Sequence, residues 1–186
     1  MIFYIHGYGS GIKKEKVLEL SKIFSQEVIG LQYDSAKGYK ENFDFLLYDI
    51  VNFYDGSKED IVIIGTSLGA FYANNLSNAL ANSRCILTNP ALEPYDGLKK
   101  YIGVHKNYVT GVEYIFTEEV LETYNIKLKI NNSSLILLSS GDKVIDSFKT
   151  QKQFEKQTNV IMYNGGEHRF KHYEEAQIDM LRFIDS

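Results

Sequence analysis

Gly65-Thr66-Ser67-Leu68-Gly69 is the stretch of the sequence that decides the fold. It follows a short apolar run, Ile61–Ile64, and leads directly into Ala70-Phe71-Tyr72-Ala73, which has the composition of a helix. A strand, a Gly-x-Ser-x-Gly turn and a helix together form a nucleophile elbow. The serine of such an elbow has a strained backbone, and the flanking glycines let the strand and the helix approach closely. The pattern predicts a Ser67 hydroxyl raised above a sheet and a Leu68 N–H at a helix start, where negative charge is favoured.

Composition places the chain among ordinary globular proteins. It has 186 residues, of which 44% are apolar, a net charge of −4 and a single cysteine, Cys85. The length suits one domain over residues 1–186, and the charge argues against nucleic acid as a partner. One cysteine excludes a disulfide framework and a Cys/His metal site. Because the chain starts with a strand-like segment and has no membrane-length apolar run, we expect a cytoplasmic protein without a membrane partner.

Apolar runs alternate with helical patterns along most of the chain, which is typical of parallel βαβ units. Six strands are expected, at Ile2–Ile5, Val28–Tyr33, Ile61–Ile64, Cys85–Thr88, Leu135–Ser139 and Val160–Tyr163. Four helices are expected, at Lys14–Phe24, Tyr39–Tyr54, Leu68–Ala81 and Tyr173–Ile184. The sequence therefore predicts an α/β fold with a mainly parallel sheet of order 2-1-3-4-5-6 and helices on both faces.

One interval, residues 89–134, interrupts the alternation. It contains both prolines of the chain, several glycines and six tyrosines or phenylalanines, but no clear βα unit. A connection of that length inside a compact domain is usually a lid or a binding element. The alternative is an irregular aromatic cover over the sheet edge. We expect this interval to shape a substrate pocket, with Tyr95 and Tyr101 against the substrate, because tyrosine offers an apolar body with a polar tip.

The chain also supplies partners for the serine. A serine hydroxyl needs a histidine base, which an acid holds in one orientation. In α/β-hydrolases the chain order is Ser, acid, His, each on the loop after a strand. Here Ser67 follows the third expected strand, Asp142 the fifth and His168 the sixth. Because ligand sites of parallel sheets lie at the carboxyl ends of the strands, we expect these three side chains to form a catalytic triad.

Other residues compete for two of these roles. Asp146 is close enough in sequence to Asp142 to be the acid, and Glu93, after the fourth strand, is a more distant candidate. The remaining histidines occupy poorer positions, in the mouth of the first strand, in the irregular interval and in the last helix: His6, His105 and His172. The first of these is expected to brace its loop.

An acyl-transfer enzyme further needs two donors for the developing oxyanion. The Leu68 N–H is one, and the loop His6–Gly11 supplies the other, with the Tyr8 N–H as the candidate, because its His-Gly start matches the glycine-rich oxyanion loop of esterases. The glycines of this loop are spaced G-x-G-x-G, which is not the G-x-G-x-x-G of a dinucleotide site. The chemistry indicated here requires no cofactor and no metal.

Taken together, these motifs resemble the small bacterial α/β-hydrolase esterases of the YqiA/YcfP type over almost the whole chain. The resemblance rests on Phe3–Tyr8, Gly65–Ala73, Asn89–Ala91 with Pro94-Tyr95, Tyr108–Gly111, Ser140–Asp146 and Gly165–Phe170. Ala70 and Glu167 depart from the family pattern, at positions outside the triad. The resemblance implies esterase activity on short acyl esters, with Ser67, Asp142 and His168 as nucleophile, acid and base.

We therefore expect a reduced α/β-hydrolase fold, without the first two antiparallel strands of larger members, that hydrolyses esters of small acyl substrates through an acyl-enzyme on Ser67. The same machinery could attack an acyl-CoA thioester or an amide. The alternative from another class is a non-catalytic protein that uses the aromatic interval as a docking surface.

Overall fold

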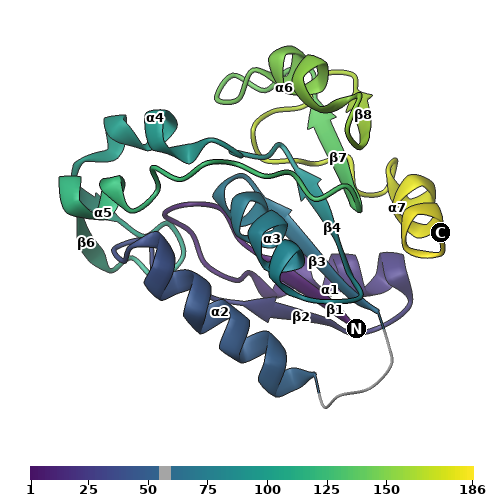
Figure 1. Cartoon of the computed structure of the whole chain (residues 1–186), viewed down its shortest axis with the longest axis horizontal. Helices are drawn as coiled ribbons and strands as arrows, with labels where there is room; N and C mark the ends of the chain where they lie inside the picture. The colour runs from purple at the N-terminus through teal and green to yellow at the C-terminus, as the bar shows by residue number, and fades with distance from the viewer. Residues whose placement is uncertain (55–59) are drawn as a thin grey trace.

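The computed structural model describes residues 1–54 and 60–186, and its centre is a six-stranded sheet (Figure 1). The strand order is β2-β1-β3-β4-β7-β8, and all five neighbouring pairs are parallel. The six strands are β1 (Ile2–Ile5), β2 (Val28–Leu31), β3 (Ile61–Thr66), β4 (Ser83–Thr88), β7 (Ser134–Ser139) and β8 (Asn159–Tyr163). The expected order 2-1-3-4-5-6 is confirmed, with β7 and β8 as its fifth and sixth strands.

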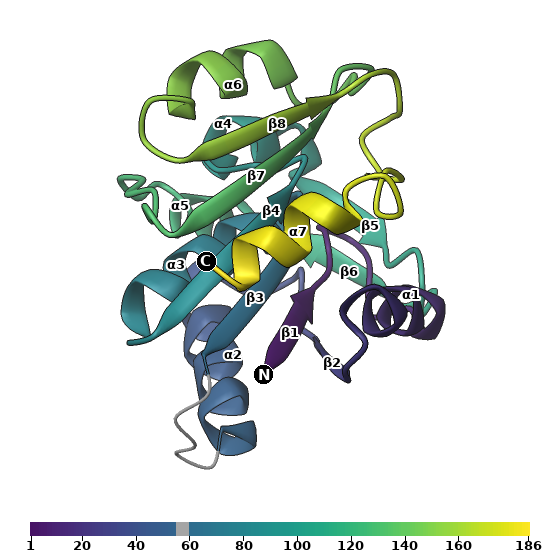
Figure 2. The ribbon, with the colours of Figure 1, turned by 90° about the vertical axis from the view of Figure 1, so that its right-hand side faces the viewer.

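Helices cover both faces of this sheet. One face is covered by α1 (Lys14–Phe24) and α7 (Gln177–Ile184), and Figure 2 shows α7 lying in front of the strands. The other face is covered by α2 (Tyr39–Phe53), α3 (Leu68–Ala79) and α6 (Ser147–Phe154). Within the described residues, no helix combines the length and the apolar character needed to cross a membrane.

Strand β1 shows why the strands are continuous apolar runs. Phe3 and Ile5 belong to the core under α2 and α3, whereas Ile2 and Tyr4 belong to the core under α1 and α7. Successive side chains of a strand point to opposite faces, and a parallel sheet is buried on both. The alternation that marks a half-exposed strand is therefore absent.

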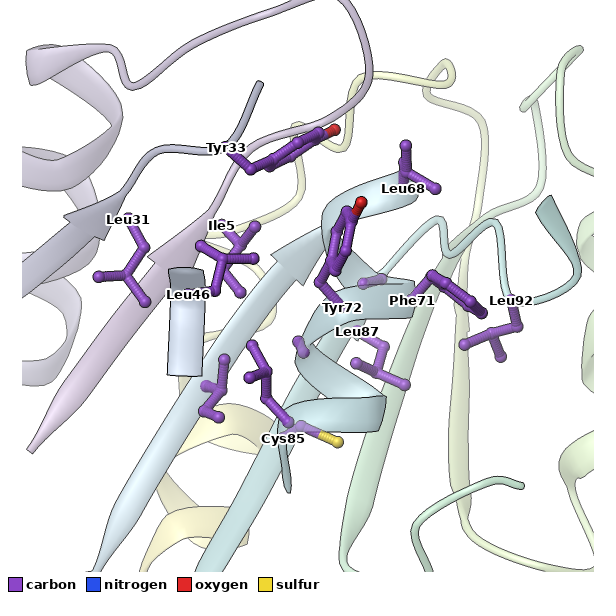
Figure 3. Close-up of a cluster of buried hydrophobic side chains, with 14 of the residues drawn as sticks. Ile5, Leu31, Tyr33, Leu46, Leu68, Phe71, Tyr72, Cys85, Leu87 and Leu92 are labelled. Atoms are coloured by element: carbon purple, nitrogen blue, oxygen red, sulfur yellow. The ribbon is translucent and has the colours of Figure 1, made fainter. Parts of the chain in front are cut away.

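Helix α3, which begins directly after Ser67, is the most deeply buried helix of the sheet's second face. Its Phe71 and Tyr72 pack against strand residues such as Ile5 and Leu87 (Figure 3). Cys85 is fully buried in the same cluster, and burial raises the pKa of its thiol to about 12. It therefore serves as a small apolar side chain.

Residues 89–134 form short elements that the sequence patterns do not predict. These are α4 (Pro94–Leu98), the 3-10 helix η1 (Lys99–Tyr101), the antiparallel pair β5 (Gly103–Lys106) and β6 (Glu113–Phe116), and α5 (Glu118–Glu122). Each is five residues or fewer, which is too short for a hydrophobic period to stand out.

Two further expectations about helices need correction. Helix α6 was not expected, because its eight residues include only two apolar side chains, Phe148 and Phe154. The last helix begins at Gln177 instead of Tyr173, because residues 173–176 form turns. Tyr173 is fully buried there, and its hydroxyl hydrogen-bonds to the hydroxyls of Thr66 and Thr88 at the end of the sheet.

Candidate active site

The elbow between β3 and α3 has the strained geometry that its sequence predicts. Ser67 has φ 55° and ψ −119°, a conformation that non-glycine residues rarely adopt. A Cβ at Gly65 would lie 2.3 Å from the Gly69 carbonyl oxygen, and a Cβ at Gly69 would lie 2.4 Å from the His6 carbonyl oxygen. Only glycine fits at either position. The close packing therefore holds Ser67 in its strained conformation.

The structure brings Ser67, His168 and Asp142 into one line. His168 Nε2 lies 2.9 Å from Ser67 Oγ, and His168 Nδ1 lies 2.8 Å from Asp142 Oδ2. The three side chains come from the loops after β3, β8 and β7, at the carboxyl ends of neighbouring or nearby strands. The imidazole thus bridges the hydroxyl and the carboxylate, which is the arrangement a general base needs.

Asp142, and not Asp146, is the acid that contacts the histidine. Its side chain is fully buried, and its Oδ1 accepts hydrogen bonds from the N–H groups of Val144 (2.7 Å) and Ile145 (3.0 Å). Burial opposes ionisation, but these bonds and the His168 contact outweigh it and hold the pKa of Asp142 below its ordinary value of 3.8. Asp146 instead caps α6, accepting from the Lys149 N–H at 2.9 Å.

Asn89 holds the loop that carries His168, a role that the sequence analysis did not assign. Its buried side-chain amide donates to the carbonyl oxygens of Glu167 and His168, both at 3.0 Å, and accepts from the Ser139 N–H at 2.7 Å. It therefore ties the loop after β8 to the end of β7. The only signal in the sequence was its place directly after β4, in the Asn-Pro-Ala motif.

The loop after β1 lies against the serine. A Cβ at Gly7 would be 3.4 Å from Ser67 Cβ. Within the part of the chain that the structure describes, no hydrogen bond uses the main-chain N–H of Tyr8 or of Leu68. The two N–H groups named from the sequence as oxyanion donors are thus not consumed by the fold.

His6 braces this loop and is not a second base. Its ring stacks on Tyr33 with centroids 4.4 Å apart, and its Nδ1 bonds to the Gly7 carbonyl oxygen at 2.8 Å. Burial lowers the pKa of His6 to about 4. The ring is therefore neutral at pH 7, with Nδ1–H as donor and Nε2 facing the Tyr33 N–H. Its role is structural.

The turn between β5 and β6 docks on the same loop. The Tyr108 N–H donates to the Gly9 carbonyl oxygen at 2.8 Å, and the Asn107 side chain donates to the Ser10 carbonyl oxygen at 2.7 Å. Asn107 also accepts from the N–H groups two and three residues further on, which shapes the turn. The irregular interval is thereby joined to the loop beside Ser67.

A cleft of about 530 Å³ opens above Ser67 and His168. Its walls come from the loop after β1, the first turn of α1, residues 90–101, residues 144–154 and the loop after His168. Tyr101 lines this cleft, but Tyr95 does not. The Tyr95 ring instead lies beside a neighbouring hollow, where its hydroxyl donates to Glu122 at 2.6 Å and Lys99 Nζ lies 4.5 Å from its centroid. The expectation that Tyr95 contacts the substrate has no support in this position.

The two remaining histidines lie elsewhere. His105 Nε2 bonds to the Tyr101 carbonyl oxygen at 2.6 Å, and His172 Nδ1 contacts Glu175 at 2.9 Å. Among the described residues, no group of three or more His, Cys, Asp or Glu side chains is arranged to hold a metal ion.

Comparison with known proteins places this geometry in context. A family model described as "Uncharacterised protein family (UPF0227)" matches residues 1–185. The UPF0227 protein YcfP of Escherichia coli O9:H4 (strain HS) is 27% identical over 174 residues, which cover 92% of this chain and 91% of that relative.

Solved structures share the fold at low identity. Alpha/beta hydrolase domain-containing protein 10 from mouse superposes with a TM-score of 0.62 at 18% identity, covering 97% of this chain and 85% of the mouse chain. A hyperthermophilic esterase from the archaeon Pyrobaculum calidifontis superposes with a TM-score of 0.61 at 14% identity, covering 98% of this chain and 75% of the esterase. The chain has the α/β-hydrolase fold.

Proposed function

This chain belongs to the UPF0227 family, as its resemblance to YcfP-type proteins predicted, and from that premise we propose that it is a serine hydrolase that cleaves esters of small acyl groups. The observation that carries the proposal is the Ser67–His168–Asp142 line, with contacts of 2.9 and 2.8 Å on a strained elbow. A fold alone does not imply an activity. Hydrogen-bonded nucleophile, base and acid at the mouth of a cleft are the features that do support one.

In the proposed reaction His168 takes the proton from Ser67 as Oγ attacks the ester carbonyl carbon. The Leu68 and Tyr8 N–H groups then bind the oxyanion of the tetrahedral intermediate. His168 returns the proton to the leaving oxygen, and the acyl-enzyme forms. Water, deprotonated by the same imidazole, attacks the acyl-enzyme and releases the acid. Asp142 holds the tautomer and stabilises the imidazolium. No step calls for a cofactor or a metal.

Residues 89–134 would serve as a wall of the acyl pocket. Leu92, Leu98 and Tyr101 from this interval line the cleft together with Phe154 of α6. These four side chains are apolar except for the tyrosine hydroxyl, and Glu93 and Lys100 of the same interval add charge beside them, which suits short, moderately polar acyl groups.

A fluorophosphonate probe tests the proposal directly, because it forms a covalent bond only with an activated serine. The wild-type protein should be labelled, with the modification mapped to Ser67, and it should hydrolyse p-nitrophenyl butyrate. The Ser67→Ala variant should do neither, while its circular dichroism and thermal unfolding match the wild type. A folded wild-type protein that is neither labelled nor active on p-nitrophenyl esters of graded chain length would overturn the proposal in favour of a binding role.

A further inference from the structure

Positive charge gathers at one side of the catalytic cleft. Lys13 and Lys16, from the start of α1, and Arg169, which directly follows His168, all line the cleft. The chain as a whole has 24 acidic and 20 basic residues, so composition does not explain such a concentration. Lys16 Nζ lies 3.9 Å from the centroid of Tyr173, which places the first turn of α1 beside the segment that follows His168.

Two of these three cations lack an acidic partner. Lys16 pairs with Glu19 at 2.5 Å. Among the described residues, no carboxylate forms an ion pair with Lys13 or Arg169. Glu167, the nearest acid in sequence to Arg169, is the ion-pair partner of Lys171. Lys13 and Arg169 therefore have no ion pair in the described part of the chain, although the pKa of Glu167 is lowered mainly by Lys171 and also by the Arg169 charge.

The positive charge of Arg169 also acts on Tyr4, a residue of strand β1. Burial raises the pKa of the Tyr4 hydroxyl, and the Thr66 hydrogen bond and the Arg169 charge oppose that rise. Tyr4, Thr66 and Tyr173 all line the cleft and join through their hydroxyls. Arg169 and Tyr4 thus line the same cleft, and the Arg169 charge acts on the Tyr4 hydroxyl.

Lys13 does not stabilise the helix that it precedes, whereas Lys16 forms an ion pair with Glu19 within that helix. Lys13 is the N-cap residue of α1 and makes no side-chain capping bond. The positive end of the helix dipole disfavours cations in the first turn. Lys13 is therefore unfavourable for α1 itself, and its side chain lines the cleft.

The other side of the cleft carries mixed charge. Lys100 and Lys149 line it there, but so do the carboxylates of Glu93 and Asp146. Only the side formed by α1 and the loop after His168 has cations without lining carboxylates. A ligand with one negative group would therefore be oriented in one direction across the cleft.

We propose that the substrate is an ester whose alcohol part carries an anionic group, a carboxylate or a phosphate, which Lys13 and Arg169 bind. The inference rests on the proposed function. It assigns the alcohol part to this side because Arg169 is adjacent to His168, the group that delivers the proton to the leaving oxygen. The acyl part would then face the opposite side, where Leu92, Leu98 and Tyr101 line the cleft.

A pair of esters of matched size separates charge from shape. The butyrate esters of 4-hydroxybenzoate and of 4-hydroxybenzamide differ by a carboxylate against a carboxamide, and a butyrate ester of 4-hydroxyphenyl phosphate adds the phosphate arm. Because charge pairs near a surface are individually weak, we expect kcat/KM to favour the better anionic ester by about tenfold over the amide. The preference should appear mainly in KM and should shrink as salt is added.

Single substitutions then identify the side chains that cause the preference for anionic esters. Lys13→Gln and Arg169→Gln should each lower the anionic-to-neutral ratio of kcat/KM by about threefold. Lys14→Gln is the matched control, because this neighbouring lysine is exposed, lies in the same helical turn and does not line the cleft. The anionic-to-neutral ratio of kcat/KM for Lys14→Gln should equal that of the wild type. The ratio is independent of the folded fraction, so loss of stability cannot imitate the result.

The outcomes are distinct. A wild-type ratio near one for both anionic esters, or an equal fall in Lys14→Gln, would overturn the inference and leave the hydrolase proposal intact. A larger ratio for phosphate than for carboxylate, or the reverse, supports the inference and identifies the anion. Absence of turnover on all three esters, together with absence of probe labelling, would remove the proposed function itself.

Discussion

Two regions meet above Ser67, and they are constructed in different ways. The loops after β3, β7 and β8 are fixed mainly by close backbone approach, to which the Asn89 side chain adds: a Cβ at Gly65, Gly69 or Gly141 would lie 2.3–2.4 Å from a carbonyl oxygen. Residues 89–134 are fixed by side chains, such as Asn107 on the loop after β1 and Tyr95 on Glu122. Steric constraint at glycine leaves a mark in the sequence, whereas a hydrogen bond between distant residues leaves none. The arrangement of the first region could therefore be predicted from the sequence, whereas that of residues 89–134 could not.

The largest expected effect tests the first region at its acid. Asp142→Asn should lower kcat on p-nitrophenyl butyrate by about 10⁴-fold, because an amide at this position favours the wrong tautomer of His168. Asp146→Asn is the control, since asparagine caps a helix about as well as aspartate, and its activity should stay within about twofold of the wild type. If the two variants swapped these effects, the acid would be assigned to the wrong residue.

A glycine in each region tests the steric argument itself. Gly65→Ala would force a Cβ against the Gly69 carbonyl and Ala70 Cα, at 2.3 and 2.5 Å, and should lower the free energy of unfolding by more than about 3 kcal/mol. Gly97→Ala, in α4, meets no atom within 4 Å and should leave stability unchanged or slightly raised. Urea unfolding of both variants measures the difference. Equal effects would mean that the two regions do not differ in packing.

How far the sequence predicts this site follows from the same contrast. Ser67, Asp142 and His168 could be placed because each follows an apolar run, and parallel strands bring such loops to one edge. The positioning role of Asn89 could not, because its partners at Glu167 and His168 are 78 and 79 positions away and carry no pattern.

The short elements could not be predicted from the sequence, for a different reason. Strand β5 has four residues of mixed character, Gly103–Lys106, and α6 has only two apolar side chains, Phe148 and Phe154, so each offers too few apolar residues for a prediction. Tyr95 and Tyr101 are the same residue type, so residue type cannot distinguish them. Only the path of α4 and η1 decides which of the two side chains lines the cleft.

Acid should destabilise the protein through His6, which lies in the loop after β1, next to the first region. Because burial lowers its pKa to about 4 from 6.5, the unfolded chain binds a proton between these pH values that the folded protein does not. Stability is therefore full above pH 6.5 and falls as the pH drops toward 4, by about 2 to 3 kcal/mol. Urea unfolding at a series of pH values measures this slope.

The variant His6→Gln isolates that contribution. It should be less stable than the wild type at pH 7, because glutamine cannot reproduce the stacking on Tyr33, but its stability should change less between pH 6.5 and 4. The loss of stability from Asp142, whose pKa is lowered from 3.8, begins as the pH falls below about 5, but it is the same in both proteins and cancels in the comparison. Parallel pH slopes for the two proteins would show that His6 is not the titrating group.

The smallest expected effect lies in the second region and concerns its two tyrosines. Tyr101 lines the cleft, so Tyr101→Ala should enlarge the acyl pocket and shift the preferred p-nitrophenyl ester toward longer chains, by a few-fold in the kcat/KM ratio of hexanoate to butyrate. Tyr95→Ala removes a ring of the same size only six positions earlier, but from the neighbouring hollow, and should leave that ratio unchanged. A shift in Tyr95→Ala as large as that in Tyr101→Ala would mean that residues 89–134 act on the pocket as one unit. In that case the side-chain contacts of this region would be as strongly coupled as the backbone contacts of the first, and the contrast between the two regions would fail.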